Sequence, residues 1–368
     1  MKFNISKERF LDGLQKVQHV VSTRTTLPIL SNVLLEARDG QLHMTTTDLD
    51  VGITGAVSAS VDKEGATTLP AKRLVSIVRE LPASEVTVSV DSKNVAKITS
   101  GPATFNIIGL SAEEFPELPD FAEAKEFEIG EKLLRDGLRK TSYSISTDET
   151  RYVLNGIFAS FKEGKMTFVA TDGRRLAMMD ADLEFPEASE TDAIIPSKAI
   201  QELQRLAVGD GKVEVKLSAS QASFSIGDTL VVSKLIEGNY PNYRQVIPAD
   251  PEERIEVDRE HLLNTVRRIS LLASDKTNSI KLAFRPGEIE VSVDSPDVGA
   301  ANEKIDVAYD GAEMQIAFNP DFLMAPLRNL DSETIIFNLI DEMSPGVIRV
   351  PSDTGGFLYV LMPMRVSG

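Results

Sequence analysis

The sequence predicts an α+β protein made of three tandem copies of one domain, each with two helices packed on antiparallel sheets. Three observations predict this fold: an internal repeat, strand and helix patterns within each repeat, and a length of 368 residues that suits three domains. At offsets of 124 and 128 residues the repeat places Phe3, Phe127 and Ile255 at equivalent positions. A unit of about 125 residues has the size of a domain rather than of a solenoid repeat.

The repeat also predicts where the domains meet. The two expected joints are rich in proline and acidic residues, which favour irregular connections over regular elements. The predicted domains are residues 1–121, 126–248 and 253–368.

The first helix of each copy is predicted by apolar residues at helical spacing. Phe10, Leu14 and Val17 lie on one face of such a helix, and Leu134 and Leu138 repeat the spacing in the second copy. Strands are predicted where valine, isoleucine or leucine alternates with polar residues, as over 86–90, 213–217 and 289–293. The six predicted helices are residues 6–20, 71–81, 131–141, 197–207, 258–269 and 320–330.

The composition is that of an ordinary globular protein, with 42% hydrophobic and 26% charged residues. The chain has no cysteine, which excludes disulfides, thiolate metal sites and cysteine nucleophiles. The first ten residues alternate in polarity like a strand rather than a signal peptide, and no apolar stretch approaches the length of a membrane span. We therefore expect a cytoplasmic protein.

The sequence lacks the motifs of common enzyme classes. It contains no Gly-rich phosphate loop, no His-Glu-x-x-His and no Gly-x-Ser-x-Gly, and its three histidines have no spacing that suggests a metal site. Asp48, Asp172 and Asp294 occupy equivalent strand ends in separate domains, so turn formation explains them better than catalysis. We expect no enzyme activity, no cofactor and no metal.

Charge is unevenly distributed along the chain. The net charge is −17, yet Lys and Arg outnumber Asp and Glu by 16 to 9 within the six predicted helices. Helix propensity alone is an alternative explanation, although glutamate forms helices equally well. If the helices share one side of a curved array, that side is positive. The basic residues include Lys72, Arg73, Arg79, Lys132, Arg135, Arg139, Lys140, Arg267 and Arg268.

Helix size decides how many chains such an array needs. Twelve helices, each about 10 Å wide, enclose a ring about 120 Å around with a bore of roughly 25 to 30 Å, whereas six leave only about 10 Å. Duplex nucleic acid is about 20 Å wide and anionic, so it passes only the larger bore. This geometry predicts two chains arranged head to tail.

Several segments, in order along the whole chain, resemble the bacterial DNA polymerase III beta subunit family. The resemblance implies three DNA-clamp domains in a ring-shaped head-to-tail homodimer with helices lining the bore. It also implies a non-catalytic sliding clamp that encircles double-stranded DNA and tethers the replicative polymerase. The alternative is an acidic, repeat-built protein scaffold that does not encircle DNA. The segments that carry the resemblance are 26–30, 151–156, 170–176, 240–243 and 362–365.

The resemblance implies DNA contacts at Arg24, Lys72 and Tyr152, with Arg73 beside them. Two positions of the same loop depart from the family pattern, where Asp148 replaces a glutamine and Val153 replaces a tyrosine. Because an aspartate repels phosphate, we expect a weaker contribution of this loop to DNA contact.

The resemblance further implies a hydrophobic pocket between the second and third domains. The carboxyl-terminal run that contributes to it is unusually apolar for a tail, although a last edge strand explains part of that run. Methionine suits a groove that receives several partners, and Arg174 and Gln245 depart from the common family residues. The implied pocket comprises Leu154, Thr171, Gly173, Arg174, Arg175, Leu176, Pro241, Gln245, Val246, Val360, Met362, Pro363, Met364 and Arg365.

The implied partners are a second copy of the chain, DNA, the replicative polymerase alpha subunit, clamp-loader subunits, and other polymerases and repair proteins with clamp-binding motifs. For the dimer interface the resemblance indicates Phe105, Leu271 and Leu272, although core packing explains the leucine pair equally well. Across the interface, Arg73 and Lys97 are expected to face Asp297 or Glu303.

Overall fold

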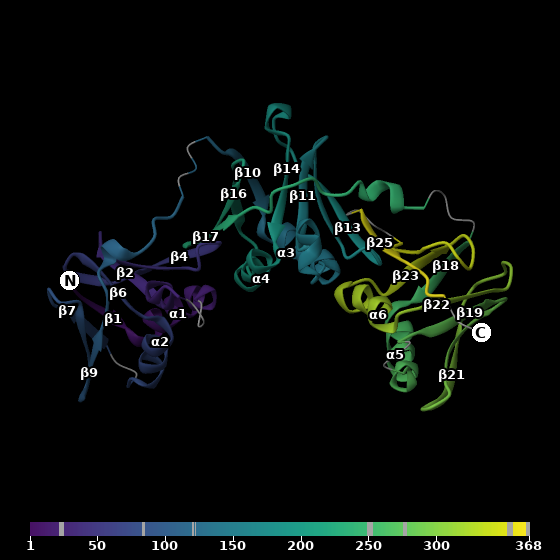
Figure 1. Cartoon of the computed structure of the whole chain (residues 1–368), viewed down its shortest axis with the longest axis horizontal. Helices are drawn as coiled ribbons and strands as arrows, with labels where there is room; N and C mark the ends of the chain where they lie inside the picture. The colour runs from purple at the N-terminus through teal and green to yellow at the C-terminus, as the bar shows by residue number, and fades with distance from the viewer. Residues whose placement is uncertain are drawn as a thin grey trace. The chain divides into compact units, whose positions relative to one another are not determined.

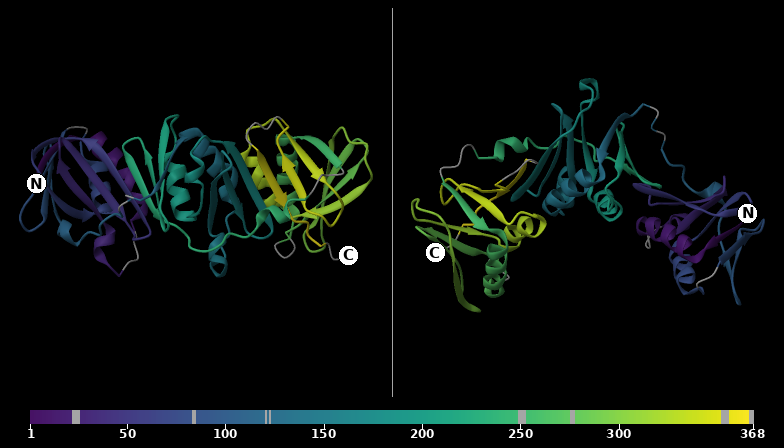
Figure 2. Two further views of the ribbon diagram at one scale, coloured as in Figure 1. Left: turned by 90° about the horizontal axis from the view of Figure 1, so that it is seen from above. Right: turned by 180° about the vertical axis from the view of Figure 1, so that it is seen from behind.

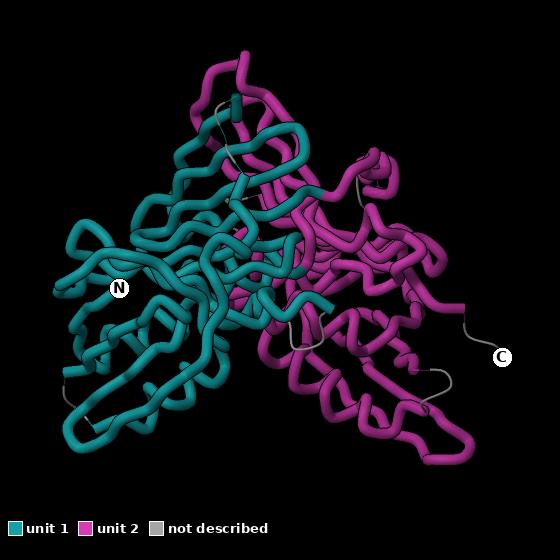
Figure 3. Tube along the Cα trace, turned by 60° about the vertical axis from the view of Figure 1, so that its left-hand side comes forward, with its two compact units in different colours: residues 1–135, 198–235 teal, residues 136–197, 236–368 magenta. Residues whose placement is uncertain are grey.

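The structure is a computed structural model that divides into two compact units (Figure 3). The first unit comprises residues 1–135 and 198–235, and the second comprises residues 136–197 and 236–368. No helix among the described residues is both long and apolar enough to cross a membrane. The structure describes residues 1–21, 26–82, 85–119, 121, 123–248, 253–274, 278–351 and 356–365.

The first unit contains a five-stranded sheet, ordered β5-β1-β7-β8-β9, and an eight-stranded sheet, ordered β10-β15-β16-β17-β4-β3-β2-β6. Helices α1 and α2 pack against each other, and α1 also contacts β4. The elements are β1 (Lys2–Ser6), α1 (Lys7–Val17), β2 (Asn32–Arg38), β3 (Gln41–Thr47), β4 (Val51–Ser58), β5 (Ser60–Lys63), β6 (Gly65–Pro70), α2 (Ala71–Glu80), β7 (Glu85–Val90), β8 (Val95–Ser100), β9 (Ala103–Ile108), β10 (Lys125–Gly130), β15 (Lys212–Leu217), β16 (Gln221–Ile226) and β17 (Thr229–Lys234).

The second unit contains an eight-stranded sheet, ordered β14-β11-β12-β13-β25-β24-β23-β18, and a four-stranded sheet, ordered β21-β20-β19-β22. Helices α5 and α6 pack against each other, with α5 on β20 and β21 (Figures 1 and 2). The elements are β11 (Gly156–Lys162), β12 (Lys165–Thr171), β13 (Arg175–Asp182), β14 (Thr191–Pro196), β18 (Glu253–Asp258), α5 (Arg259–Ile269), β19 (Ile280–Arg285), β20 (Glu288–Ser295), β21 (Gly299–Asp306), β22 (Met314–Phe318), α6 (Pro320–Asn329), β23 (Thr334–Leu339), β24 (Gly346–Arg349) and β25 (Phe357–Leu361).

The unit boundary crosses two further helices, α3 (Glu131–Thr141) and α4 (Ser197–Leu206). All six predicted helices are therefore confirmed, with ends within three residues of those predicted. Side-chain caps explain several of the starts: Ser6 accepts a hydrogen bond from the backbone N–H of Arg9 at 3.4 Å, and Asp258 accepts one from that of His261 at 2.6 Å. The predicted apolar face of α1 is buried at Phe10, Leu14 and Val17.

The element order recurs three times, with one additional strand, β5, in the first copy, and the copies join by one kind of strand pairing. The last strand of the second copy, β17, pairs antiparallel with the fourth strand of the first copy, β4. The last strand of the third copy, β25, pairs antiparallel with the fourth strand of the second copy, β13. Each junction is therefore a continuous backbone-bonded sheet. Within the described residues, β9 and β21 each pair with one neighbour and remain sheet edges.

Gly13 and Gly137 occupy equivalent positions in helices α1 and α3, but we expect alanine at the two positions to change the free energy of unfolding by different amounts. An alanine Cβ at Gly137 would lie 2.4 Å from the Phe168 ring, whereas at Gly13 it would meet the terminal methyl of Met44 at 2.1 Å. Both neighbours are fully buried, but the methionine side chain is flexible and can rearrange, whereas the phenylalanine ring is rigid. Overpacking costs about 1–3 kcal/mol, and removing a helix glycine returns up to about 1 kcal/mol. We expect Gly137→Ala to lower the free energy of unfolding by about 1–2 kcal/mol, and Gly13→Ala to change it by less than about 0.5 kcal/mol.

Urea denaturation of the two variants measures this difference. Equal free energies of unfolding for both variants would contradict the contrast between a rigid and a movable neighbour.

Candidate functional site

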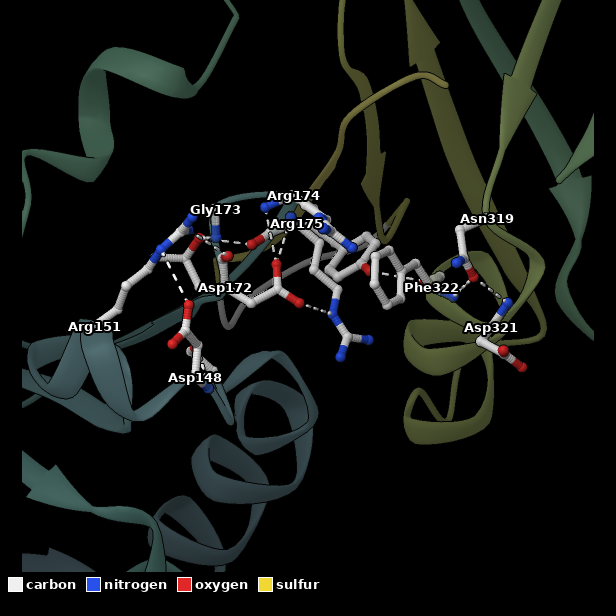
Figure 4. A network of polar contacts seen from close by, with 12 residues as sticks. Asp148, Arg151, Asp172, Gly173, Arg174, Arg175, Asn319, Asp321 and Phe322 are labelled. Atoms are coloured by element: carbon white, nitrogen blue, oxygen red, sulfur yellow. Dashed lines mark hydrogen bonds and ion pairs between the residues drawn. The ribbon is translucent and has the colours of Figure 1, made fainter. Parts of the chain in front are cut away.

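A tight turn between β12 and β13 places the central residues of the predicted pocket. One Asp172 carboxylate oxygen accepts hydrogen bonds from the backbone N–H groups of Arg174 at 2.9 Å and Arg175 at 3.1 Å. The Thr171 hydroxyl donates to the carbonyl of Arg175 at 2.7 Å and accepts from the N–H of Gly173 at 3.1 Å. Gly173 has a φ of +85°, which glycine adopts without strain. The turn leaves Gly173 and Arg174 exposed (Figure 4).

Arg175 ties this turn to the third copy of the repeat. Its Nε donates to Asp172 at 3.0 Å, and its guanidinium lies 4.2 Å from the ring centre of Phe322 on α6 (Figure 4). The buried Tyr359 donates its hydroxyl proton to the Phe322 carbonyl at 2.7 Å, and burial raises the pKa of this tyrosine. Both members of the Arg175–Asp172 pair are largely buried, so the pair fixes the turn more firmly than a surface ion pair would.

An apolar cluster lies along the β13–β25 junction. The register pairs Leu176 with Val360, and both side chains are 2% exposed. Tyr240 stacks on Phe158 with ring centres 5.0 Å apart, and burial raises the pKa of Tyr240. The predicted meeting of Leu176 and Val360 is therefore present. The cluster comprises Val169, Leu176, Val347, Leu358 and Val360, with Phe158, Met178, Tyr240, Tyr243 and Ile247 packed against it.

The tail after β25 continues along the same junction. The N–H of Met362 donates to the carbonyl of Arg174 at 3.0 Å, and that of Met364 donates to the carbonyl of Ala317 at 2.8 Å. Residues 362–365 line a cavity of about 610 Å³. The four tail residues therefore line one cavity, and their role in a partner pocket stays a prediction. The remaining lining comes from the third copy, namely Lys281, Gln315, Ala317, Glu342 and Met343, which sequence reasoning missed.

Eight of the predicted pocket residues belong to neither the cavity lining nor the cluster. Four of them form the β12–β13 turn described above, and the other four lie elsewhere. Leu154 is buried at the end of the 3₁₀ segment η5 (Glu149–Leu154). Pro241, Gln245 and Val246 are exposed, the last two within η7 (Tyr243–Val246). This segment contributes to the cluster instead through Tyr243, whose ring centre lies 6.0 Å from that of Phe158.

Asp148 has a structural role that the expectation of phosphate repulsion did not include. It caps η5 by accepting hydrogen bonds from the backbone N–H of Thr150 at 3.0 Å and from its hydroxyl at 2.6 Å. The hydroxyl bond is the main reason why the pKa of Asp148 lies below its ordinary value. Arg151 lies 3.6 Å from the same carboxylate and donates to the Asp172 carbonyl at 3.3 Å, which connects η5 to the turn (Figure 4).

The other residues assigned to DNA contact differ in exposure. Tyr152 is 58% exposed and Val153 is half-buried. Both rest on Gly238, where a Cβ would lie 2.9 Å from Val153. Lys72 and Arg73 are exposed on α2. Arg24 lies outside the described residues.

Ion pairing separates the helix cations into two groups. Arg135, Arg139 and Arg268 pair with Asp210, Asp331 and Glu303. The other predicted members of the positive surface make no ion pair within the described ranges, so their charge remains available to an anion. These six free cations are Lys72, Arg73, Arg79, Lys132, Lys140 and Arg267.

The residues implied in dimer contact lie on or beside the two sheet edges. Phe105 is 37% exposed and Ile108 is 77% exposed, both on β9. Leu271 is 78% exposed in η8 (Ser270–Leu272), and Leu272 lies against the start of β21, 3.8 Å from a Cβ built on Gly299. Exposed apolar side chains beside an unpaired edge are a common feature of interfaces.

Glu303 is already engaged within its own chain, which changes the expected salt bridges. Arg268 donates to it at 2.9 Å and Thr265 donates its hydroxyl at 2.9 Å. The bond from Arg268 is the main cause that lowers the pKa of Glu303 to about 2. Of the two predicted partners for Arg73 and Lys97, Asp297 is the one that is exposed and makes no ion pair in the described part of the chain.

The fold and the site together define a chain of tandem α+β domains whose sheets continue across each junction, with an apolar cluster at the second junction and a cavity lined by residues 362–365. The chain matches the profiles of the N-terminal, central and C-terminal domains of the DNA polymerase III beta subunit over residues 1–119, 128–242 and 244–365. The chain therefore belongs to the DNA polymerase III beta subunit family, the beta sliding clamps.

Named relatives and solved structures agree with this assignment. The beta sliding clamp of Caulobacter vibrioides is 36% identical over 375 residues, and that of Chlamydia muridarum is 34% identical over 366 residues. These alignments cover the whole of this chain and 100% and 99% of the relatives. The sliding clamps of Bartonella birtlesii, bound to griselimycin, and Bacillus subtilis superpose with TM-scores of 0.94 and 0.95 at 36% and 32% identity, with full coverage of both chains.

Proposed function

We propose that two copies of this chain close head to tail into a ring that encircles duplex DNA and tethers the replicative polymerase, without catalysis of its own. The proposed domains are residues 1–121, 126–248 and 253–368, and the proposed place of action is the cytoplasm. Family membership favours this function over the acidic scaffold that was the alternative.

The strand series is the observation that carries the proposal. Last strands β17 and β25 pair with fourth strands β4 and β13 inside the chain. The last strand of the first copy, β9, and the fourth strand of the third copy, β21, have no such pairing among the described residues and lie at sheet edges. Pairing β9 of one copy with β21 of another continues the series, and two such pairings close a ring of six copies. Exposed apolar residues beside both edges support this pairing.

The pocket at the second junction is the proposed docking site for partners. The apolar cluster of the junction, the adaptable methionines of the cavity and the exposed Arg174 suit a short linear motif that inserts apolar side chains. The proposed partners are the polymerase alpha subunit, clamp-loader subunits, and other polymerases and repair proteins. The η5 segment, with Tyr152 and Val153, is a proposed DNA contact next to this site.

Retention on circular DNA tests the proposal. The free protein should have a mass of about 80 kDa, twice the 40.2 kDa chain. After loading onto a nicked circle it should remain bound, and cutting the circle should release it. Equal release from circles and linear DNA would refute topological binding, because a ring leaves only by sliding over an end.

Neutralising two free cations on α2 should weaken direct DNA binding. Each phosphate contact contributes about −0.9 to the slope of log affinity against log salt. We expect Lys72→Gln with Arg73→Gln to reduce the magnitude of this slope by about 1 to 2 and to weaken binding similarly for all sequences. Fluorescence anisotropy with a labelled duplex across a salt series measures the slope.

A matched pair on a strand provides the control. Lys212 and Lys216 on β15 pair with Glu128 and Glu126. Replacing both by glutamine removes the same formal charge and should leave the slope unchanged. An equal change for both double variants would indicate a net-charge effect rather than phosphate contact by α2.

A further inference from the structure

The first junction of the chain repeats the turn that builds the partner pocket. Asp48 accepts hydrogen bonds from the backbone N–H groups of Asp50 at 3.0 Å and Val51 at 2.8 Å, as Asp172 does in the second copy. Thr47 donates to the Val51 carbonyl at 3.0 Å, as Thr171 does to Arg175. The N–H of Lys234 donates to the Asp50 carbonyl at 2.8 Å, which matches the bond from Met362 to Arg174. The backbone of the partner pocket is therefore present twice.

A cavity of about 680 Å³ accompanies the first-junction turn. Its walls come from the turn, from strand β17 and from the extended segment 116–119. Leu118 of that segment lies against β4, only 2.7 Å from where a Cβ on Gly52 would be. Leu118 thus already packs on the backbone of β4, and the cavity lies beside this leucine. The size is that of a pocket for a small ligand or a few side chains.

Leu49 has an unusual conformation at the edge of this cavity. Its φ is +79°, close to the +85° of the equivalent Gly173, and its side chain is 44% exposed. A bulky side chain is strained in this region, and exposure gives it no burial energy in return. Neither the turn nor the core needs a leucine here, because glycine serves in the second copy. Leu49 therefore presents an exposed apolar side chain at the edge of the cavity.

The charges at the two junctions are opposite in sign. In the first-junction turn, Asp50 stands where the second copy has Arg174. Lys234, which also lines the cavity, pairs with Asp50 at 3.0 Å, so these two charges offset each other. Glu117 lines the cavity and, like Glu113 and Glu114 just before it, is exposed and makes no ion pair within the described residues. The first-junction cavity therefore favours positive charge.

We propose that the first-junction cavity is a second docking site, which binds a short extended peptide carrying a leucine-sized side chain next to lysine or arginine. The apolar side chain contacts Leu49 and Val232, and the basic side chain faces Glu117. The site is distinct from the second-junction pocket and does not depend on DNA encirclement. The same dimer can therefore hold two chemically different peptides on each chain.

The test uses the full-length protein and the labelled peptide GSKLKSG, with a photoactivatable leucine in place of its leucine. Crosslinking followed by mass spectrometry should locate the peptide at residues 47–52, 116–119 or 232–234. Leu49→Gly and Glu117→Lys should each weaken binding at least fivefold, and the peptide GSELESG should bind at least tenfold more weakly. Leu49→Gly keeps the turn, since glycine adopts the required φ, and circular dichroism checks that both variants are folded.

Met362→Ala separates the two junctions. Unchanged affinity for the basic peptide in this variant supports a first-junction site. Crosslinks at 362–365, a loss of affinity in Met362→Ala, or no saturable binding would overturn the proposal. None of these outcomes bears on whether the protein encircles DNA.

Discussion

Deleting residues 362–368 is expected to weaken binding of a polymerase-derived clamp-binding peptide by at least about 100-fold, or about 2.7 kcal/mol, while the dimer stays intact. The deletion removes four of the nine residues that line the 610 Å³ cavity and the backbone bond from Met362 to Arg174. Strand β25 remains paired with β13 and β24, so the third core keeps its last strand. Fluorescence anisotropy measures the affinity, and light scattering measures the mass.

A shorter deletion controls for truncation itself. Removing only residues 366–368 keeps Met362 to Arg365 and should leave peptide affinity unchanged. If the longer deletion bound the peptide as tightly as the intact protein, the tail would not be part of the partner site.

Phe105→Asp is expected to raise the dimer dissociation constant by at least about 100-fold and to abolish retention on circular DNA. The side chain is already 37% exposed in the single chain, so an aspartate there is tolerated by the fold. In the proposed dimer the same carboxylate would be buried beside β21 without a partner, which costs about 3 kcal/mol or more. Sedimentation across a dilution series measures the dissociation constant.

Val208→Asp is the matched control for that substitution. Val208 is 75% exposed just after α4 and lies on neither sheet edge. It should leave both dimerisation and retention unchanged. A dimer that resisted Phe105→Asp would show that β9 is not the contact strand.

The local elements were predictable because their determinants are close together in the chain. Apolar spacing predicted helix 258–269, and the structure places α5 at Arg259–Ile269. The capping role of Asp148 also had a local signal, since an aspartate two residues before a threonine favours such a turn. Sequence reasoning weighed that carboxylate only as a charge and therefore missed its hydrogen bonds.

The long-range parts of the site were not predictable from patterns alone. Arg175 stacks on Phe322, about 150 positions later in the chain, and no periodicity relates the two. Met343 and Gln315 also line the cavity formed by residues 362–365, and they were missed for the same reason. The bond from Arg268 to Glu303 within the chain was likewise not predicted, because no sequence pattern relates the two residues. The meeting of Leu176 and Val360 was predicted only from the family resemblance, because a family's fold already includes pairings between residues distant in the chain.

The strand pairing at the junctions has a further consequence for where a closed ring would open. The β17–β4 and β25–β13 junctions each align five residue pairs between strands of one polypeptide. A tethered strand faces its partner at an effective concentration of about 1 mM, whereas a strand of another chain is present only at the protein's own concentration. At 1 μM protein this difference is about 1000-fold, or about 4 kcal/mol. Junctions of similar architecture thus differ in reversibility, and the seam between chains is the one that dilution or a loading machine can separate.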